Sequence, residues 1–139
     1  MEPLFDHERL DVYRLLLEFI EWVTALIEEV RGAAPGKVGE VCDHLDRASL
    51  SALFNTAEGN GKRQRATRAH FFDVARGSAT ECAACLDALV AKKAAAAERV
   101  LVGKEMLVRA VSMLTKLVQR YSDEGGVREE EAVYEVAVE

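Results

Sequence analysis

The chain has 139 residues, half of them hydrophobic and 30% charged, and its formal net charge at pH 7 is −6. This length predicts one domain that can bury a hydrophobic core. The acidic balance is unlike the strongly basic composition of a dedicated nucleic-acid-binding protein. The sequence has no stretch of about 18 uninterrupted apolar residues and no signal-peptide pattern near its N-terminus, so we expect a cytoplasmic protein that does not enter a membrane.

Apolar residues recur at three- and four-residue steps along most of the chain and never alternate with polar ones over the length of a strand, which is typical of amphipathic helices. Four helices are predicted: from just after Asp6 to about Arg31, from about Val38 to Glu58, from about Ala66 to Lys93, and from the alanine-rich residues 92–97 to the Gly125-Gly126 pair. Short connections between such helices predict antiparallel neighbours. We therefore expect an all-α fold, an antiparallel up-down-up-down four-helix bundle of residues 1–122.

The centres of the apolar stripes predict these core residues: Leu16, Leu45, Phe71, Leu86, Leu107 and Leu114. Gly59, Asn60 and Gly61 are predicted to break the helix between the two middle segments, since glycine is costly in a helix interior. Small residues around Gly77 predict the close approach of a partner helix in the middle of the third segment.

Three aromatic residues lack an obvious place within one chain. Trp22 lies at the edge of the first apolar stripe, where it fits either the core or a contact between subunits. Phe5 or Phe72 is likewise left without a partner. Because unpartnered apolar side chains favour association, we expect a homo-oligomer.

Residues 123–139 differ in composition from the rest of the chain. They hold seven acidic residues and one basic residue, so the whole net negative charge of the protein lies in them. They carry too little apolar surface for a fold of their own, although Val133, Tyr134, Val136 and Val138 could dock on a partner. We expect a flexible acidic tail.

Three motifs follow one another in the middle of the chain: RAxxS from Arg47, NxAEGxG from Asn55, and a phenylalanine followed by ARGSxxE from Ala75. This pattern resembles that of the four-helix-bundle proteins often called 23S rRNA intervening-sequence proteins, in the order of elements over roughly residues 5 to 122. Members of that family are similar to accessory bundle proteins of diversity-generating retroelements, which form pentameric rings and bind nucleic acid and a reverse transcriptase. The resemblance therefore implies a pentamer.

Lys62, Arg63, Arg65 and Arg68 place four cations in seven residues with no acid among them. Such a cluster can contact RNA phosphates or can be a solvated turn. Cations near a helix N-terminus oppose the helix dipole, so the cluster is not there to stabilise the third helix. No aromatic residues interleave with it for base stacking, which favours phosphate contacts that do not depend on sequence.

The polar residues of the motifs are Arg47, Asn55, Glu58, Arg76, Ser78 and Glu81. In an antiparallel hairpin Arg47 lies level with Arg76, and two neighbouring arginines need carboxylates. We expect one structural charge network between the second and third helices. Glu58 and Glu81 are the carboxylates that acid–base chemistry would use, but we interpret them as parts of this structural network and assign no catalytic residue.

Three cysteines, an odd number, predict reduced thiols rather than a disulfide framework. Cys82 and Cys85 have the spacing of redox and zinc motifs, but a continuous helix lacks the turn that lowers a thiol pKa. Cys82 also fits the apolar stripe as a small hydrophobic residue. We assign no metal and no cofactor; a minor enzyme alternative would use this pair, alone or with Cys42 or His44 around zinc.

Taken together, these features predict a non-enzymatic helical bundle that assembles with itself and offers a composite surface to RNA or a nucleoprotein. The alternative is a protein-only structural or interaction module whose acidic tail is a docking segment.

Overall fold

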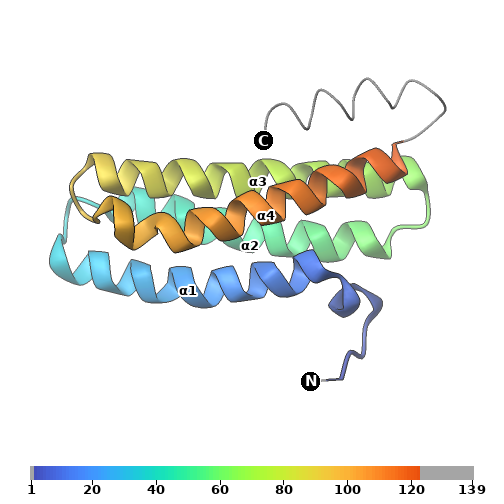
Figure 1. Cartoon of the computed structure of the whole chain (residues 1–139), viewed down its shortest axis with the longest axis horizontal. Coiled ribbons are helices and arrows are strands. Elements are labelled where there is room, and N and C mark those ends of the chain that lie inside the picture. Colours follow the sequence, from blue (N-terminus) through green and yellow to red (C-terminus); the bar gives the residue numbers. More distant parts are fainter. Residues whose placement is uncertain (1, 123–139) are drawn as a thin grey trace.

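The computed structural model describes residues 2–122 and consists of helices joined by short turns (Figure 1). A short 3-10 helix, η1 (Asp6–Arg9), precedes four α-helices: α1 (Asp11–Ala33), α2 (Gly39–Gly61), α3 (Arg65–Ala91) and α4 (Ala97–Tyr121). No strand occurs among these residues, which confirms the all-α prediction. No helix in this part of the chain combines the length and apolarity needed to cross a bilayer. The predicted acidic tail, 123–139, and its Gly125-Gly126 pair lie outside the described residues.

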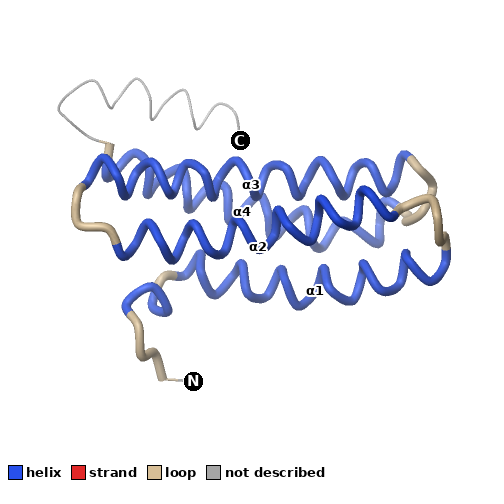
Figure 2. Tube along the Cα trace, turned by 180° about the vertical axis from the view of Figure 1, so that it is seen from behind, coloured by secondary structure: helices blue, strands red, loops and turns tan. Residues whose placement is uncertain are grey.

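Neighbouring helices run in opposite directions, as the view from behind also shows (Figure 2). Ser51 of α2 faces Ser78 of α3 and His44 faces Glu81, so numbers fall along one helix as they rise along the other. Each helix packs on two neighbours: α1 and α3 each pack on both α2 and α4. The diagonal pairs make no close backbone contacts within residues 2–122, which is the arrangement of a four-helix bundle.

Five of the six predicted core residues are fully buried: Leu16, Leu45, Leu86, Leu107 and Leu114. The prediction for Phe71 is wrong, because its neighbour Phe72 is the buried residue and Phe71 is half-exposed. The inner face of α3 runs through Phe72, Ala75, Ala79 and Cys82, at steps of three and four residues. A helix phase set from Phe71 is one position out of step with that face.

The predicted helix break at Gly59 to Gly61 is also wrong. α2 continues through Gly61, and the chain turns only at residues 62–64. A Cβ atom at Gly59 would lie 3.1 Å from the Cδ1 and Cε1 atoms of the Phe72 ring, so this glycine permits close packing of α2 on α3. Gly77 is the reverse case, since it faces open space and the small residues that allow close approach are Ala75 and Ala79.

Trp22 lies inside the chain's own bundle, half-buried between α1 and α4. Its ring covers Gly103, where an added Cβ would lie 2.2 Å from the Trp22 Cζ3 atom. The Arg99 guanidinium lies over the Trp22 ring, with its central carbon 5.5 Å from the ring centre. Its Nε and Nη2 atoms donate hydrogen bonds of 3.0–3.2 Å to the Glu29 carboxylate. Of the two readings of Trp22, the structure therefore supports the core.

Candidate functional site

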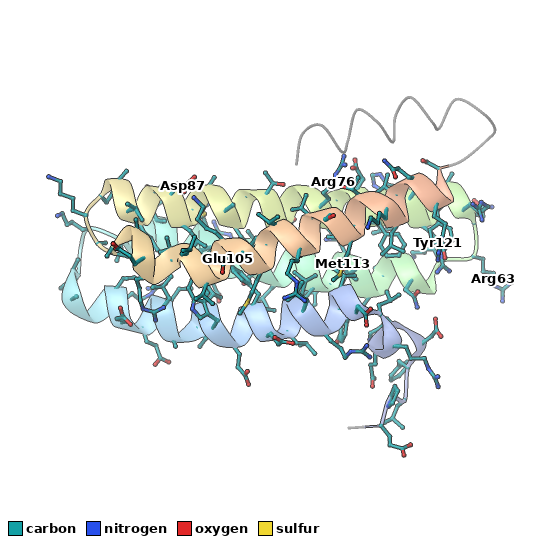
Figure 3. All side chains as sticks on the ribbon, viewed as in Figure 1. Arg63, Arg76, Asp87, Glu105, Met113 and Tyr121 are labelled. Atoms are coloured by element: carbon teal, nitrogen blue, oxygen red, sulfur yellow. The ribbon has the colours of Figure 1, made fainter. Side chains whose placement is uncertain are left out.

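The four predicted cations Lys62, Arg63, Arg65 and Arg68 gather at one end of the bundle, where α2 turns into α3; we call them the cationic turn. The C-terminus of α4 lies at the same end and brings Tyr121 against the turn, while Arg63 points away from the bundle (Figure 3). This contact joins residues more than fifty positions apart. An aromatic residue therefore accompanies the cations, contrary to the expectation from their immediate sequence.

Arg68 is the most enclosed member of the cationic turn. Its Nη1 donates to the Lys62 carbonyl at 2.9 Å, and its Nη2 donates to Asn60 Oδ1 at 3.2 Å and lies 3.5 Å from the Tyr121 hydroxyl. Its guanidinium carbon lies 4.5 Å from the centre of the Tyr121 ring. Lys62 is the C-cap of α2, so Arg68 binds a carbonyl that the helix itself leaves unpaired.

Arg65 and Lys62 also have partners within the bundle. Arg65 donates to the Arg120 carbonyl at the end of α4 and lies 5.2 Å from the Tyr121 ring centre. Lys62 pairs with Glu58 at 3.1 Å and lies 5.2 Å from the centre of the Phe71 ring. Two arginines near the start of α3 thus donate hydrogen bonds to carbonyls at the C-terminal ends of α2 and α4. These bonds explain why cations stand at the N-terminus of α3, where they oppose the dipole of their own helix.

Arg63 is the remaining member of the cationic turn, and it is exposed without an ion pair or hydrogen bond to the rest of residues 2–122. Sequence reasoning missed two further cations at this end, Lys116 and Arg120, both exposed on the last turns of α4. The predicted helix order could have located them, because an up-down bundle places the end of its fourth helix beside the turn between its second and third helices.

The predicted polar network divides into separate groups. Ser78 and Ser51 exchange a hydrogen bond of 2.8 Å between α3 and α2, and Asn55 Nδ2 donates to the Ser51 carbonyl at 2.9 Å. Both serines and Asn55 are half-buried, so this group fastens the two helices from within their contact. Ser78 and Asn55 are thus the two residues of the expected network that lie together in one hydrogen-bonded group.

The charged residues of that prediction lie in separate contacts, of which only the one between Glu81 and His44 joins α3 to α2. Arg76 pairs with Asp73 of its own helix at 2.8 Å and donates to Thr115 of α4 at 3.3 Å, so it joins α3 to α4 rather than to α2. Glu81 lies 3.6 Å from His44, with about half of each side chain exposed. Arg47 is exposed and takes part in neither contact. A single network of Arg47 and Arg76 is therefore not formed.

All three cysteines are buried free thiols. Burial, reinforced by the neighbouring Cys85 and Glu81, raises the pKa of the Cys82 thiol to about 12, and burial also raises the pKa values of Cys42 and Cys85. Thiols that stay protonated are poor nucleophiles and poor metal ligands. Across residues 2–122, no group of three or more His, Cys, Asp or Glu side chains is placed to hold a metal ion.

Comparison with known proteins places the chain in a family. The sequence model of the 23S rRNA-intervening sequence proteins matches residues 8–116, which span η1 in part, α1 to α3, and most of α4. A search of curated protein sequences gives no match. The matched region contains the cationic turn, the serine pair and all three cysteines. The chain belongs to the 23S rRNA-intervening sequence protein family.

Proposed function

We propose that the protein is a non-enzymatic bundle, located in the cytoplasm, that assembles with copies of itself and presents a composite surface to RNA or a nucleoprotein. The observation that carries this proposal is the concentration of cations at one end of the bundle. The cationic turn lies there with Lys116 and Arg120, and the carboxylates nearby are engaged: Glu58 with Lys62, and Asp6 with Asn60 at 2.9 Å.

The contacts of these cations favour phosphate as the ligand. Arg65 and Arg68 are fixed by carbonyls and by the Tyr121 ring. Arg65 is the exposed one of the two, so little conformational entropy is lost when its remaining N–H groups meet an anion. The same two guanidinium groups lie over Tyr121, which leaves its ring unsuited to base stacking. Binding should then be sensitive to salt and largely independent of sequence.

One copy offers few charges, so assembly is part of the proposal. A pentamer, the state implied by the family resemblance, would place about twenty cations of the cationic turn on a common rim if all copies face the same way. Weak contacts to one phosphate chain would then add up. The proposal assigns no catalytic residue, metal or cofactor.

A protein-only interaction module is the second candidate. It is favoured by the structural use of Lys62, Arg65 and Arg68, which leaves Arg63 as the one unengaged member of the cationic turn. The acidic residues 123–139 would then be the docking segment, because their charge suits a basic protein surface rather than RNA.

The test uses Arg63, because replacing Arg65 or Arg68 would also disturb the ends of α2 and α4. RNA binding is measured by fluorescence anisotropy at low and moderate salt for wild type and Arg63→Glu, with Lys92→Glu as the matched control at the opposite, exposed end of α3. We expect Arg63→Glu to weaken binding at least tenfold at low salt and to flatten its salt dependence, and Lys92→Glu to change little. Equal affinities of the three proteins would refute the RNA surface, and no RNA binding by wild type would support the protein-only module.

A further inference from the structure

The N-terminal arm, residues 2–5, carries the most exposed apolar side chains of the described chain. Leu4 is 88% exposed and Phe5 is 65% exposed. The Glu8 carboxylate accepts hydrogen bonds from the backbone N–H groups of Leu4 at 3.0 Å and Phe5 at 3.3 Å, and the Phe5 ring stacks on His7. The arm thus holds two large apolar groups in solvent in a defined conformation. Its backbone runs away from the bundle (Figure 1).

The arm leaves the bundle on one particular side of α1. Asp6 accepts a hydrogen bond of 2.9 Å from Asn60 near the end of α2, and η1 packs on α1 and α2. η1 makes no close backbone contact with α4 in the described part of the chain. The base of the arm therefore lies on the α2 side of α1.

The other side of α1 carries an unfilled hollow, which we call the α1–α4 groove. Its volume is about 240 Å³, and Leu10, Val12, Met113 and Leu117 line its apolar floor. Met113 lies between α4 and α1 in Figure 3. Lys116 and Arg120 form a cationic rim. Asp11, the acid beside them, already pairs with Arg14 at 2.6 Å, so the rim has an excess of positive charge.

We propose that the arm of one copy docks in the α1–α4 groove of a second copy. Leu4 and Phe5 would cover the apolar floor, and Glu2 would meet Lys116 and Arg120. The inference rests on the self-assembly proposed above and names the surfaces that carry it. Because arm and groove lie on different sides of α1, the contact is head-to-tail, and its repetition closes a ring when the rotation between copies permits.

Another hollow of similar size lies between α3 and α4 and suits the arm less well. Ala79, Ala83, Val108 and Val111 make it apolar, but its one cation, Lys104, is held by Asp87 at 2.6 Å. It therefore offers no free positive charge to Glu2. Charge complementarity thus favours the α1–α4 groove.

Mixtures of two variants, each with one added surface cysteine, test the contact directly. Leu4→Cys protein is mixed with Lys116→Cys protein under mild oxidation, so that a disulfide between them joins two different chains. The native thiols are buried and stay out of the reaction. We expect a disulfide-linked heterodimer, whereas Leu4→Cys mixed with Phe54→Cys, an exposed position on α2, should give none. An assembled protein without the Leu4–Lys116 crosslink would overturn the proposal.

Light scattering of charge-exchanged variants supplies an independent readout. We expect Glu2→Lys with Phe5→Ser to raise the dissociation constant of the assembly at least tenfold, and Phe54→Ser to leave it unchanged. In a chain that carries Glu2→Lys but keeps Phe5, the further changes Lys116→Glu and Arg120→Glu should restore assembly. A monomeric wild type would refute the proposed self-assembly itself, whereas an assembly that the arm variants leave intact would refute only this contact.

An intrachain disulfide between Tyr134→Cys and Lys116→Cys would instead assign the groove to the acidic C-terminal segment.

Discussion

The contact of α2 with α3 and that of α1 with α4 both place a glycine opposite an aromatic ring, but they are built differently. Between α2 and α3 small residues follow one another along both helices, and the two backbones approach closely over much of their length. Between α1 and α4 the backbones approach far less, and one large ring, Trp22, enters a notch opened by Gly103. Close packing is thus spread along one contact and concentrated at one position of the other.

This difference decides how each contact tolerates an added methyl group. At Gly59 the new atom would meet Phe71 and Phe72 at 3.1 Å, a separation that small shifts can relieve. At Gly103 it would lie 2.2 Å from the Trp22 ring, which must move as a whole. The following predictions test this contrast.

Gly103→Ala should have the largest effect. Displacement of Trp22 should lower the free energy of unfolding by about 2–3 kcal/mol, despite the better helix propensity of alanine. Urea unfolding followed by circular dichroism measures it. In a Trp22→Leu background the same substitution should cost much less, because the smaller side chain vacates the notch; equal costs in both backgrounds would contradict the proposed clash.

Gly59→Ala should lower the free energy of unfolding by about 1–2 kcal/mol, since Phe72 is fully buried and has little room to move. Gly61→Ala is the matched control on the same helix end, where an added Cβ meets nothing within 4 Å. A stability of Gly59→Ala at or above that of Gly61→Ala would show that the α2–α3 contact is not tightly packed at this point.

The buried thiol of Cys82 makes the α2–α3 side of the bundle sensitive to alkaline pH. Its folded pKa of about 12 lies above the ordinary value of 9.0, so the folded state binds the proton more tightly than the unfolded state. Its contribution is fully present at neutral pH and is lost as pH rises through 9 toward 12; at pH 10 the loss is on the order of 1 kcal/mol. Chemical unfolding at pH 7 and pH 10 should show a smaller decrease for Cys82→Ala than for wild type, and equal decreases would argue against an enclosed thiol.

Gly77→Ala should have the smallest effect and the opposite sign. Gly77 lies in the interior of α3 with nothing within 4 Å of an added Cβ, so alanine should raise the free energy of unfolding by about 0.5–1 kcal/mol. A rise in the thermal midpoint measures the gain. A loss of stability would mean that Gly77 packs against another surface, such as a second copy of the chain.

The sequence allowed correct prediction of features that repeat along a helix. The periods of Leu16, Leu45 and Leu107 locate the core because each helix needs one apolar face whatever its partners are. The adjacent residues Phe71 and Phe72 cannot be distinguished in this way, since either one can lie on the apolar face of α3. The choice depends on the register of α3 against its neighbours, which no local pattern specifies.

Features that join distant segments could not be predicted in this way. Gly59 looks like a helix breaker until the Phe72 ring opposite it is known, and no local pattern indicates that Trp22 covers Gly103. Arg65 binds the end of α4, and Arg68 joins the end of α2 to Tyr121 of α4. A cluster that suggests a phosphate site from the sequence alone therefore also caps two helix ends in the folded chain. Arg63 and Arg65 are exposed, and of the two only Arg63 has no partner among residues 2–122.

The position of Trp22 has a consequence for the study of folding. It is the chain's single tryptophan, and it contacts α4 across the largest separation in sequence between packed helices. Its fluorescence therefore reports the closure of the first helix onto the last, whereas circular dichroism reports helix formation everywhere. Contacts between successive helices close short loops, and the loop between α1 and α4 is the longest. A stopped-flow experiment that follows both signals would show whether the bundle closes after its three successive helix pairs have formed.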